Sequence, residues 1–299
     1  MSAAPSLQDA LARGPLVLDG GLSNQLEAQG CDLSDALWSA RLLADDPGQL
    51  TAAHRAYVDA GARVLITSSY QASFEGFARR GLDRAQAAGM FRRSVAAARA
   101  AAGEQPVWVA ASVGPYGAVQ ADGGEYRGRY GLSVTALERF HRPRIEALVA
   151  AAPDVLALET VPDADEAEAL LRAAQGCGTP VWLSYTISGA TTRAGQPLAD
   201  AFAVAAGNDQ VLAVGVNCCT AQDADAAIDV AARVTGKPVV VYPNSGETWD
   251  AARHRWQGEP TFDPGRARAW AARGARLIGG CCRVGPGLVA SLAAELENR

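Results

Sequence analysis

The sequence has little positive charge, no long apolar run and no export signal at its start. Its 299 residues contain 27 Lys+Arg against 32 Asp+Glu, which leaves a formal net charge of -5 and no surplus of cations for the phosphates of a nucleic acid. No stretch approaches the roughly 18 uninterrupted apolar residues of a membrane-spanning helix, and the first residues lack a basic start followed by an apolar run. We therefore expect a cytoplasmic protein that binds neither nucleic acid nor a membrane.

Histidine and cysteine are also scarce, with 3 and 6 residues. Six cysteines are too few to staple a chain of this length with disulfides. His54, His141 and His254 fall in expected helices or a loop, so neither a Ser/His/Asp arrangement nor a histidine-ligated hydrolase centre is indicated. The sequence also has no Walker-type phosphate loop, and Gly279-Gly280 opens no dinucleotide-binding pattern.

Short apolar runs alternate with longer helical segments along the whole chain. Runs rich in Val, Leu and Ile predict strands at 16–19, 63–68, 107–113, 155–159, 181–186, 211–217, 238–242 and 276–280. Apolar residues spaced three and four apart predict helices at 49–60, 83–102, 133–151, 163–174, 197–206, 221–234, 264–273 and 287–297. Strands that are apolar throughout and separated by crossover helices are typical of a parallel sheet covered on both faces.

The number of these units indicates the fold class. Eight strand-helix units in 299 residues favour an α/β fold closed into a (β/α)8 TIM barrel, with an open doubly wound sheet as the alternative. No linker divides the chain, so residues 1–299 are expected to form a single domain. The one long irregular stretch, 114–131, has six glycines and three tyrosines, which indicate a shaped binding loop, with a mobile insertion as the alternative.

Adjacent cysteines follow the sixth and eighth predicted strands. In a TIM barrel the chemistry collects at the carboxyl ends of the strands, and these two ends should lie roughly 10 Å apart at about 4.8 Å per strand. Thiolates from both ends can meet at one zinc ion, because Zn–S bonds of about 2.3 Å bring sulfurs to within about 4 Å of each other. Of the four candidates we select Cys218, Cys281 and Cys282, with Cys219 pointing away. Gly279-Gly280 removes side-chain bulk before the second pair, and three thiolates leave one zinc position open, as in a catalytic site.

Two carboxylates stand at the same rim, Asp19 after the first strand and Glu159 after the fourth. Together they can hold the ammonium group of an amino acid through charge-assisted hydrogen bonds. Each also has a structural alternative, since either can cap a following helix or pair with an arginine. The cysteines can likewise be small buried apolar residues, because adjacent cysteines do not match the commoner C-x2-C zinc pattern. Spacing alone does not decide between these interpretations.

Nine motifs spread over almost the whole chain carry a family resemblance. They are LDGGLSNQLE (18–27), TSSYQAS (67–73), ASVGPYG (111–117), ADGGEYRG (121–128), FHRPRIEAL (140–148), LALET (156–160), GVNCC (215–219), YPNSGE (242–247) and GGCC (279–282). With these motifs the sequence resembles the homocysteine S-methyltransferase family. It looks most like the branch that uses S-methylmethionine or S-adenosylmethionine, rather than the betaine-dependent or cobalamin-dependent branches. The ordered G-x-N-C and GGCC elements are highly specific, whereas DGG or PNSGE alone would be weak.

The resemblance implies roles for individual residues. It implies a zinc ion held by Cys218, Cys281 and Cys282. It also implies that the homocysteine ammonium group lies near Asp19 and Glu159, and its carboxylate near the backbone amides of Gly20 and Gly21. The methyl donor is expected among rim-loop residues beside the zinc, namely Tyr70, Gln71, Tyr116, Asn244 and Glu247. A tyrosine face favours a sulfonium by a cation–π contact of roughly 0.5–2 kcal/mol, with packing in the core as the alternative role of either tyrosine.

The resulting hypothesis is a zinc-dependent methyltransferase of methionine biosynthesis. It would convert L-homocysteine to L-methionine with a sulfonium methyl donor, and zinc is the only cofactor expected. Coordination to zinc would present the homocysteine thiol as a thiolate, which favours a cationic electrophile. The alternatives are transfer to another thiol or selenol, such as selenohomocysteine, and a non-catalytic zinc or redox protein.

Overall fold

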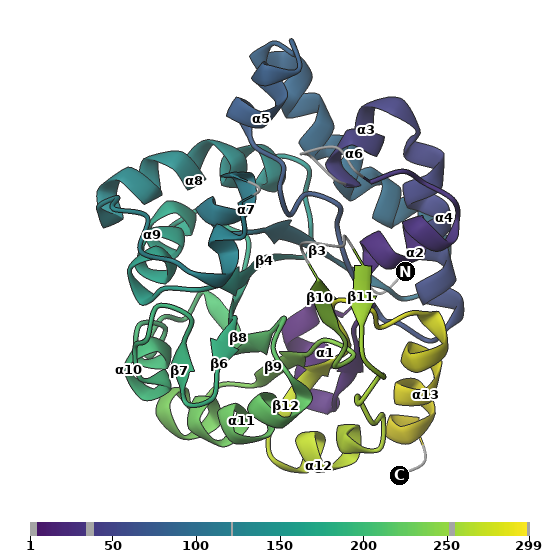
Figure 1. The fold of residues 1–299 in the computed structure, drawn as a ribbon, viewed down its shortest axis with the longest axis vertical. Coiled ribbons are helices and arrows are strands. Elements are labelled where there is room, and N and C mark those ends of the chain that lie inside the picture. Colours follow the sequence, from purple (N-terminus) through teal and green to yellow (C-terminus); the bar gives the residue numbers. More distant parts are fainter. Residues whose placement is uncertain (1–4, 34–38, 121, 251–254, 298–299) are drawn as a thin grey trace.

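Eight parallel strands form a ring at the centre of the fold, which Figure 1 shows from one end. The computed structural model describes residues 5–33, 39–120, 122–250 and 255–297. In chain order, which is also their order around the ring, the strands are β1 (Leu16–Val17), β2 (Val64–Ile66), β3 (Trp108–Val113), β4 (Val155–Val161), β5 (Val181–Tyr185), β8 (Val211–Asn217), β9 (Val239–Tyr242) and β12 (Ala275–Ile278). Leu18 pairs with Val64 and so closes the ring between the first two strands. The predicted (β/α)8 barrel is therefore confirmed.

The eight helices that the apolar spacing predicted surround the ring (Figure 1). They are α4 (Pro47–Asp59), α6 (Arg84–Ala102), α8 (Val134–Val149), α9 (Ala164–Ala174), α10 (Leu198–Ala203), α11 (Ala221–Thr235), α12 (Arg266–Ala272) and α13 (Pro286–Glu297). Local signals set their ends: the Asp83 side chain accepts a hydrogen bond from the Gln86 amide at the start of α6, and Gly236 ends α11 with a left-handed φ of 64°. The helices thus begin and end close to where the sequence predicts.

Shorter elements, which the sequence did not predict, lie between these units. They are α1 (Leu7–Arg13), α2 (Leu22–Ala28), α3 (Ser39–Asp45), α5 (Phe74–Arg79), α7 (Tyr116–Gln120), the 3-10 turn η1 (Gly124–Tyr126), and the hairpins β6 (Ile187–Ser188) with β7 (Thr191–Thr192) and β10 (Thr248–Asp250) with β11 (Arg255–Gln257). None of these helices exceeds 7 residues, which is too short for a helical period to show in the sequence. Two of them, α7 and η1, lie in the stretch 114–131 that was expected to be irregular.

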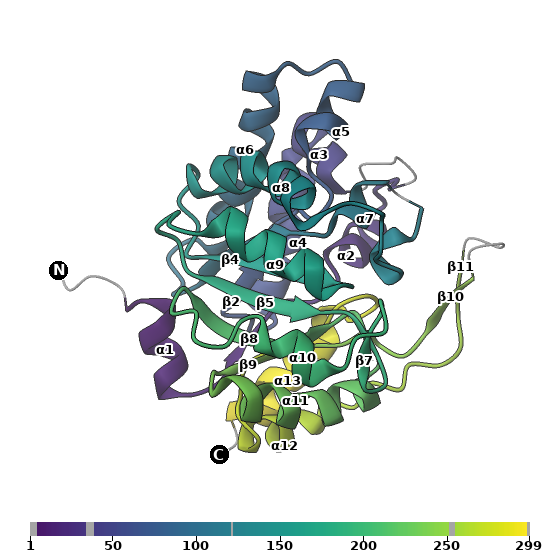
Figure 2. The same cartoon turned by 90° about the vertical axis from the view of Figure 1, so that its left-hand side faces the viewer.

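Two clusters of buried apolar side chains hold the barrel together. The inner cluster fills the ring and includes Leu18, Trp182 and Leu277, while the outer cluster packs the helices against the strands. Leu7 and Leu11 of α1 belong to the inner cluster, so α1 closes the amino end of the ring. Figure 2 shows α1 at one end of the barrel, and α7 and the projecting β10–β11 hairpin toward the other. None of the helices that the structure describes combines the length and hydrophobicity needed to span a bilayer.

Candidate metal centre

Three cysteine sulfurs converge at the carboxyl end of the ring. The Sγ atoms of Cys218, Cys281 and Cys282 all lie within 4.8 Å of one another, which is near the spacing of about 4 Å that sulfurs adopt around one tetrahedral zinc. The sulfurs of Cys218 and Cys281 are in direct contact, as in a disulfide, and the Cα atoms of this pair are 5.7 Å apart. With that pair reduced, the three side chains could bind a metal ion.

Backbone turns bring these cysteines together. Cys218 directly follows β8, and its φ of 49° lies in the left-handed region that residues other than glycine rarely adopt. Cys281 follows β12 after two glycines, and its amide donates to the Pro243 carbonyl (2.8 Å) at the end of β9. A Cβ on Gly280 would lie 2.2 Å from Val284 Cγ1, so this turn requires glycine. The turn brings the cysteine sulfurs closer together than the roughly 10 Å expected between the two strand ends.

Cys219 lies in a different environment from its neighbour. Its side chain is buried in the outer apolar cluster, and burial raises the pKa of its thiol. Cys282 is half-buried beside the other two sulfurs, and burial raises the pKa of its thiol to about 11. Within the described ranges, Cys218, Cys281 and Cys282 form the one group of Cys, His or carboxylate side chains placed to bind a metal.

Asn217 ties together the strand ends around Cys218. Its Oδ1 accepts hydrogen bonds from the Thr160 amide (2.8 Å) and Ser184 Oγ (2.5 Å), and its Nδ2 donates to Thr160 Oγ1 (2.7 Å). Thr160 Oγ1 lies 3.7 Å from Cys218 Sγ. Thr160 also has a left-handed backbone, with a φ of 56°. Such conformations persist only where the surroundings hold them. Asn217 therefore holds the left-handed backbone of Thr160 through its hydrogen bonds, and that of Cys218 as its neighbour in the chain.

Asp19 keeps one carboxylate oxygen without a partner. Its Oδ2 accepts a hydrogen bond from the Ile66 amide (2.8 Å), whereas Oδ1 is buried and has no hydrogen-bond partner in the described part of the chain. Burial raises the pKa of Asp19 against the effect of the Ile66 amide, and the charge of Glu159 raises it further. An unsatisfied buried acceptor costs about 1–3 kcal/mol, so this position favours a ligand that donates hydrogen bonds.

Glu159 is the second buried carboxylate of the rim. It accepts hydrogen bonds from Ser112 Oγ and from Tyr242 Oη, the latter at 2.9 Å. Burial raises its pKa from 4.5 to about 7, although both hydroxyl groups act in the opposite direction. Because the charges of Asp19 and Glu159 interact, the two carboxylates belong to one site. The structure thus brings together both carboxylates that the sequence singled out.

The Gly20-Gly21 turn packs against the segment that follows the cysteines. The Gly21 amide donates to the Val284 carbonyl (2.9 Å), and Tyr57 Oη donates to the Gly21 carbonyl (2.9 Å). A Cβ on Gly20 would lie 2.0 Å from the Val284 oxygen. The turn therefore supports the loop of Cys281, and the Gly21 amide is already bonded within the protein.

Two of the predicted donor-site residues contact the loop that carries Cys282. Asn244 Oδ1 accepts a hydrogen bond from the Cys282 amide (3.1 Å). Glu247 forms an ion pair with Arg283, with 3.1 Å between Arg283 Nη2 and Glu247 Oε1. Both contacts orient the loop that carries Cys281 and Cys282, and a role in donor binding stays a prediction for each residue.

The other three predicted donor-site residues differ in position. Gln71 is buried, and its Nε2 donates to the Ala118 carbonyl (3.0 Å). The Tyr116 ring packs against Phe140, with 4.9 Å between ring centroids. Tyr70 is half-buried, and burial raises the pKa of its phenol, with the nearby Thr160 hydroxyl acting against the rise. Tyr70 thus lies beside Thr160, near Cys218, whereas Tyr116 packs among aromatic rings.

Four polar side chains that support the site were given no role from the sequence. They are Ser112, Thr160, Asn217 and Tyr242, at or near the ends of their strands. All four lie within motifs that carry the family resemblance and at or near the ends of predicted strands, which was the available signal.

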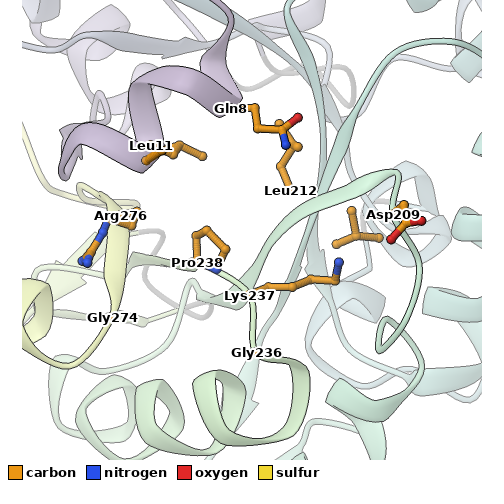
Figure 3. Close-up of a pocket in the computed structure, with 11 residues that line it drawn as sticks. Gln8, Leu11, Asp209, Leu212, Gly236, Lys237, Pro238, Gly274 and Arg276 are labelled. Atoms are coloured by element: carbon orange, nitrogen blue, oxygen red, sulfur yellow. The ribbon is translucent and has the colours of Figure 1, made fainter.

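A separate cavity of about 760 Å³ lies at the amino end of the barrel. Figure 3 shows Lys237 and Arg276 around it, with Leu11 of α1 nearby. Lys237 Nζ donates to the Asn208 carbonyl (2.9 Å), and Arg276 Nη1 donates to the Ala271 carbonyl (3.0 Å). Because both cations are engaged with the backbone and the cysteines lie at the other end, we assign no ligand to this cavity.

Comparison with known proteins places the chain in a family. The family model described as Homocysteine S-methyltransferase matches residues 16–296. Similar proteins include Homocysteine S-methyltransferase of Escherichia coli (strain K12), 45% identical over 94% of each chain, and Homocysteine S-methyltransferase YbgG of Bacillus subtilis (strain 168), 42% identical over 96% of each. The crystal structure of the homocysteine methyltransferase MmuM from Escherichia coli matches with a TM-score of 0.85 in its metallated form (43% identity, 94% of this chain and 96% of that chain). Its oxidized form matches with a TM-score of 0.84 (44% identity, 94% and 95%). The chain therefore belongs to the homocysteine S-methyltransferase family.

Proposed function

We propose that this protein transfers a methyl group from a sulfonium donor, S-methylmethionine or S-adenosylmethionine, to L-homocysteine and so forms L-methionine. The observation that carries the proposal is a cluster of three cysteine sulfurs within 4.8 Å of one another, at the same rim as the buried carboxylates Asp19 and Glu159. A thiol-rich metal site near an ammonium-binding site fits a substrate that has both a thiol and an amino group. The names of the relatives support the same substrate.

Zinc is the metal that this set of ligands fits best, because three thiolates with a fourth position open are typical of a catalytic zinc site. Cys218, Cys281 and Cys282 would hold it. When bound, zinc would lower the pKa of the homocysteine thiol, so that the substrate reacts as a thiolate. Because thiolates are the ligands, all three cysteines have to be reduced for zinc to bind.

The two carboxylates would bind the ammonium group of homocysteine. Asp19 Oδ1 is the buried acceptor that lacks a donor, and an ammonium group has three N–H donors to offer. Glu159 is held by Ser112 and Tyr242, and a cation beside it favours its ionised form. Since the Gly21 amide is bonded to Val284, the substrate carboxylate would bind at the Gly20 amide of this turn.

The chemical step requires orientation rather than proton transfer. A new S–CH3 bond forms at the homocysteine sulfur while the old S–CH3 bond of the donor breaks, and its electron pair returns to the donor sulfur. No proton moves in this step, so no general base is needed. The side chains around the rim have to hold the two sulfurs and the methyl carbon in line, which can contribute roughly 7–11 kcal/mol. Asn244 and Glu247 serve this purpose through the loop of Cys282.

The test is methionine formation by the purified zinc-loaded protein with homocysteine and one donor at a time. We expect methionine from S-methylmethionine, S-adenosylmethionine or both, and none from betaine. Methionine from betaine alone, or from no donor while zinc is bound, would contradict the proposal. Rates with selenohomocysteine and other small thiols define the acceptor, and homocysteine should give the highest kcat/KM.

A further inference from the structure

The loop after α7 carries a buried carboxylate that the proposed mechanism does not use. Glu125, in η1, is 7% exposed, and its Oε2 finds no hydrogen-bond partner among the residues that the structure describes. Burial raises its pKa. Buried charges in proteins are normally paired or bind a ligand, because an isolated buried charge is costly. Glu125 Oε2 therefore lacks, within the described part of the chain, the hydrogen-bond donor or cation that a buried carboxylate normally has.

The two arginines of the same loop form other contacts. Arg129 Nε donates to the Ala194 carbonyl (2.8 Å). Arg127 Nη2 binds Asp122 Oδ2 at 3.0 Å, and the side chains of both residues are more than half exposed. Farther along the chain, Arg193 stacks over the Tyr126 ring at 5.6 Å from the centroid. Glu125 forms no ion pair with any residue that the structure describes. A cationic ligand could supply the missing charge.

The position of Glu125 is fixed by packing. A Cβ on Gly117 would lie 2.5 Å from the Glu125 amide nitrogen, so α7 and η1 are in backbone contact. The Tyr116 amide, at the start of α7, donates to the buried Glu166 Oε1 (2.6 Å). This buried anchor connects α7 to α9 and fixes the loop that presents Glu125.

The turn that carries Glu125 lies beside the cysteine cluster. The side chain of Tyr126, the next residue in η1, forms a hydrogen bond with the Cys282 thiol. Burial raises the pKa of the Tyr70 phenol and the charge of Glu125 adds to the rise, and the Tyr70 ring lies against Gly114 at the start of the same loop. Glu125 therefore lies near the place where the two substrate sulfurs would meet.

We propose that Glu125 binds the positive charge of the sulfonium group in the methyl donor. This inference rests on the proposed function and names the residue that makes the site select a cationic donor. A sulfonium has no N–H or O–H, so a carboxylate attracts it through charge alone. After transfer the donor sulfur is a neutral thioether, which loses this attraction and is released more readily.

This role predicts a specific kinetic signature. The thiolate and the sulfonium neutralise each other as the methyl group moves, so the transition state has less positive charge for Glu125 to stabilise than the bound donor has. Glu125 therefore contributes to donor binding more than to the chemical step. Removing its charge should raise the donor KM and leave kcat unchanged or slightly higher, whereas a purely structural role would not separate the two constants in this way.

The variant Glu125→Gln removes the charge and keeps the shape of the side chain. Asp122→Asn is the matched control, because it removes a carboxylate from the same loop that is exposed and paired with Arg127. In the full-length zinc-loaded protein, we expect E125Q to raise the KM for S-methylmethionine by at least about tenfold and to change kcat by less than about threefold. Its homocysteine KM and zinc content should match the wild type and its Tm should not fall, and D122N should match the wild type in donor KM, kcat and zinc content.

Calorimetry without homocysteine isolates the sulfonium charge from the rest of the donor. The isostere 2-amino-5-methylhexanoate has the shape, ammonium group and carboxylate of S-methylmethionine, with an uncharged CH in place of the sulfonium. The wild type should bind S-methylmethionine at least about tenfold more tightly than this isostere. E125Q should bind the two ligands within about threefold of each other, and Glu125→Asp, which keeps the charge, should retain the preference.

The outcomes separate this inference from the proposed function. An unchanged donor KM in E125Q overturns the inference. An equal loss of affinity for both ligands also overturns it, because it would place Glu125 at the donor ammonium group. If the wild type forms no methionine from homocysteine and either sulfonium, the proposed function itself fails.

Discussion

The buried polar residues of this site differ in whether the protein itself satisfies them. Asn217 bonds to Thr160 and Ser184 through both ends of its amide. Asp19 and Glu125, in contrast, each keep one buried oxygen without a partner in the described part of the chain. Satisfied groups fix geometry, whereas unsatisfied ones are completed by what binds. The unpaired oxygens support the proposals that Asp19 and Glu125 bind cationic groups of the substrates.

Replacement of a cysteine in the metal cluster should abolish metal binding and leave the fold intact. Cys281→Ala removes one of three sulfurs at the rim, and Cys281 packs only at the edge of the inner apolar cluster, so the fold should persist. We expect bound zinc and methyl transfer to be lost while the circular dichroism spectrum stays that of the wild type. Cys219→Ala is the matched control, because Cys219 is buried outside the cluster, and this variant should keep its zinc. Full transfer activity in metal-free C281A would refute the mechanism.

Glu159→Gln should weaken homocysteine binding and spare the metal. The amide keeps the size of the side chain but loses the charge that attracts an ammonium group. We expect the homocysteine KM to rise at least about tenfold, with zinc content unchanged. Because the pKa of Glu159 is about 7, the wild-type kcat/KM for homocysteine should fall below that pH, and the fall should be smaller in the variant. Loss of zinc from E159Q would show that Glu159 supports the metal instead.

The same variant should stabilise the fold in a defined pH range. Burial raises the pKa of Glu159 from 4.5 to about 7, so the folded protein resists ionisation of this group. The resulting cost is absent below pH 4.5, grows as the pH rises to about 7, and is complete above it. Urea unfolding should therefore show E159Q gaining stability over the wild type between these pH values, by a few kcal/mol at most at about 1.4 kcal/mol per pKa unit. A difference that does not change with pH would contradict the assignment.

At this scale, the sequence locates residues at strand ends more readily than residues whose position depends on the fold of a loop. Cys218, Asp19 and Glu159 each follow or end a strand, so the barrel geometry alone gathers them. The position of Glu125, which we propose binds the sulfonium, depends on the contact of α7 with η1, and neither element has a recognisable period. Gln71 and Tyr116 were predicted to bind the methyl donor, but both make contacts within the protein. A position on the rim does not by itself distinguish a residue that binds a ligand from one that packs against its neighbours.

Among the secondary-structure elements, those that cover the core were predictable and the short ones were not. A strand such as β8 is apolar along its length because helices and barrel interior bury both faces. A helix such as α5 has 6 residues, and its start depends on a hydrogen bond that the Gly76 amide donates to Ser73 Oγ. The sequence also did not predict the register shift between Leu158 and Val161 in the pairing of β4 with β5. This shift includes Glu159 and Thr160, and it directs both residues toward the site.

Asn217→Ala should test how far the strand ends support the cysteines. The change leaves the Thr160 amide, which now donates to Asn217 Oδ1, buried and unpaired. We expect a loss of about 1–3 kcal/mol in the free energy of unfolding for that group. Zinc affinity should fall about 10-fold to 100-fold, as for other residues that orient metal ligands. Competition with a chromogenic chelator measures that affinity, and a destabilised variant with wild-type zinc affinity would separate Asn217 from the metal site.

At the scale of the whole molecule, the barrel separates stability from chemistry. Leu7 and Leu11 of α1 join the inner apolar cluster at the amino end, whereas the cysteines and carboxylates lie at the carboxyl end. The ring between them is a rigid packed core, not an open channel. The unsatisfied groups at one end reduce stability, and the apolar closure at the other end offsets them. Changes at the amino end should therefore alter unfolding without altering the reaction.

Leu11→Ala tests this separation directly. Leu11 is 3% exposed, and truncating a buried leucine costs about 2–5 kcal/mol, so Tm and the urea midpoint should fall. At 25 °C, where the variant stays folded, kcat and the KM for each substrate should remain within about twofold of the wild type. Leu132→Ala is the control, because Leu132 is 40% exposed and its removal should leave Tm nearly unchanged. A rise in the homocysteine KM of folded L11A would show that the packing of the amino end reaches Asp19 and Glu159 through the ring, and the two ends would then be one coupled unit.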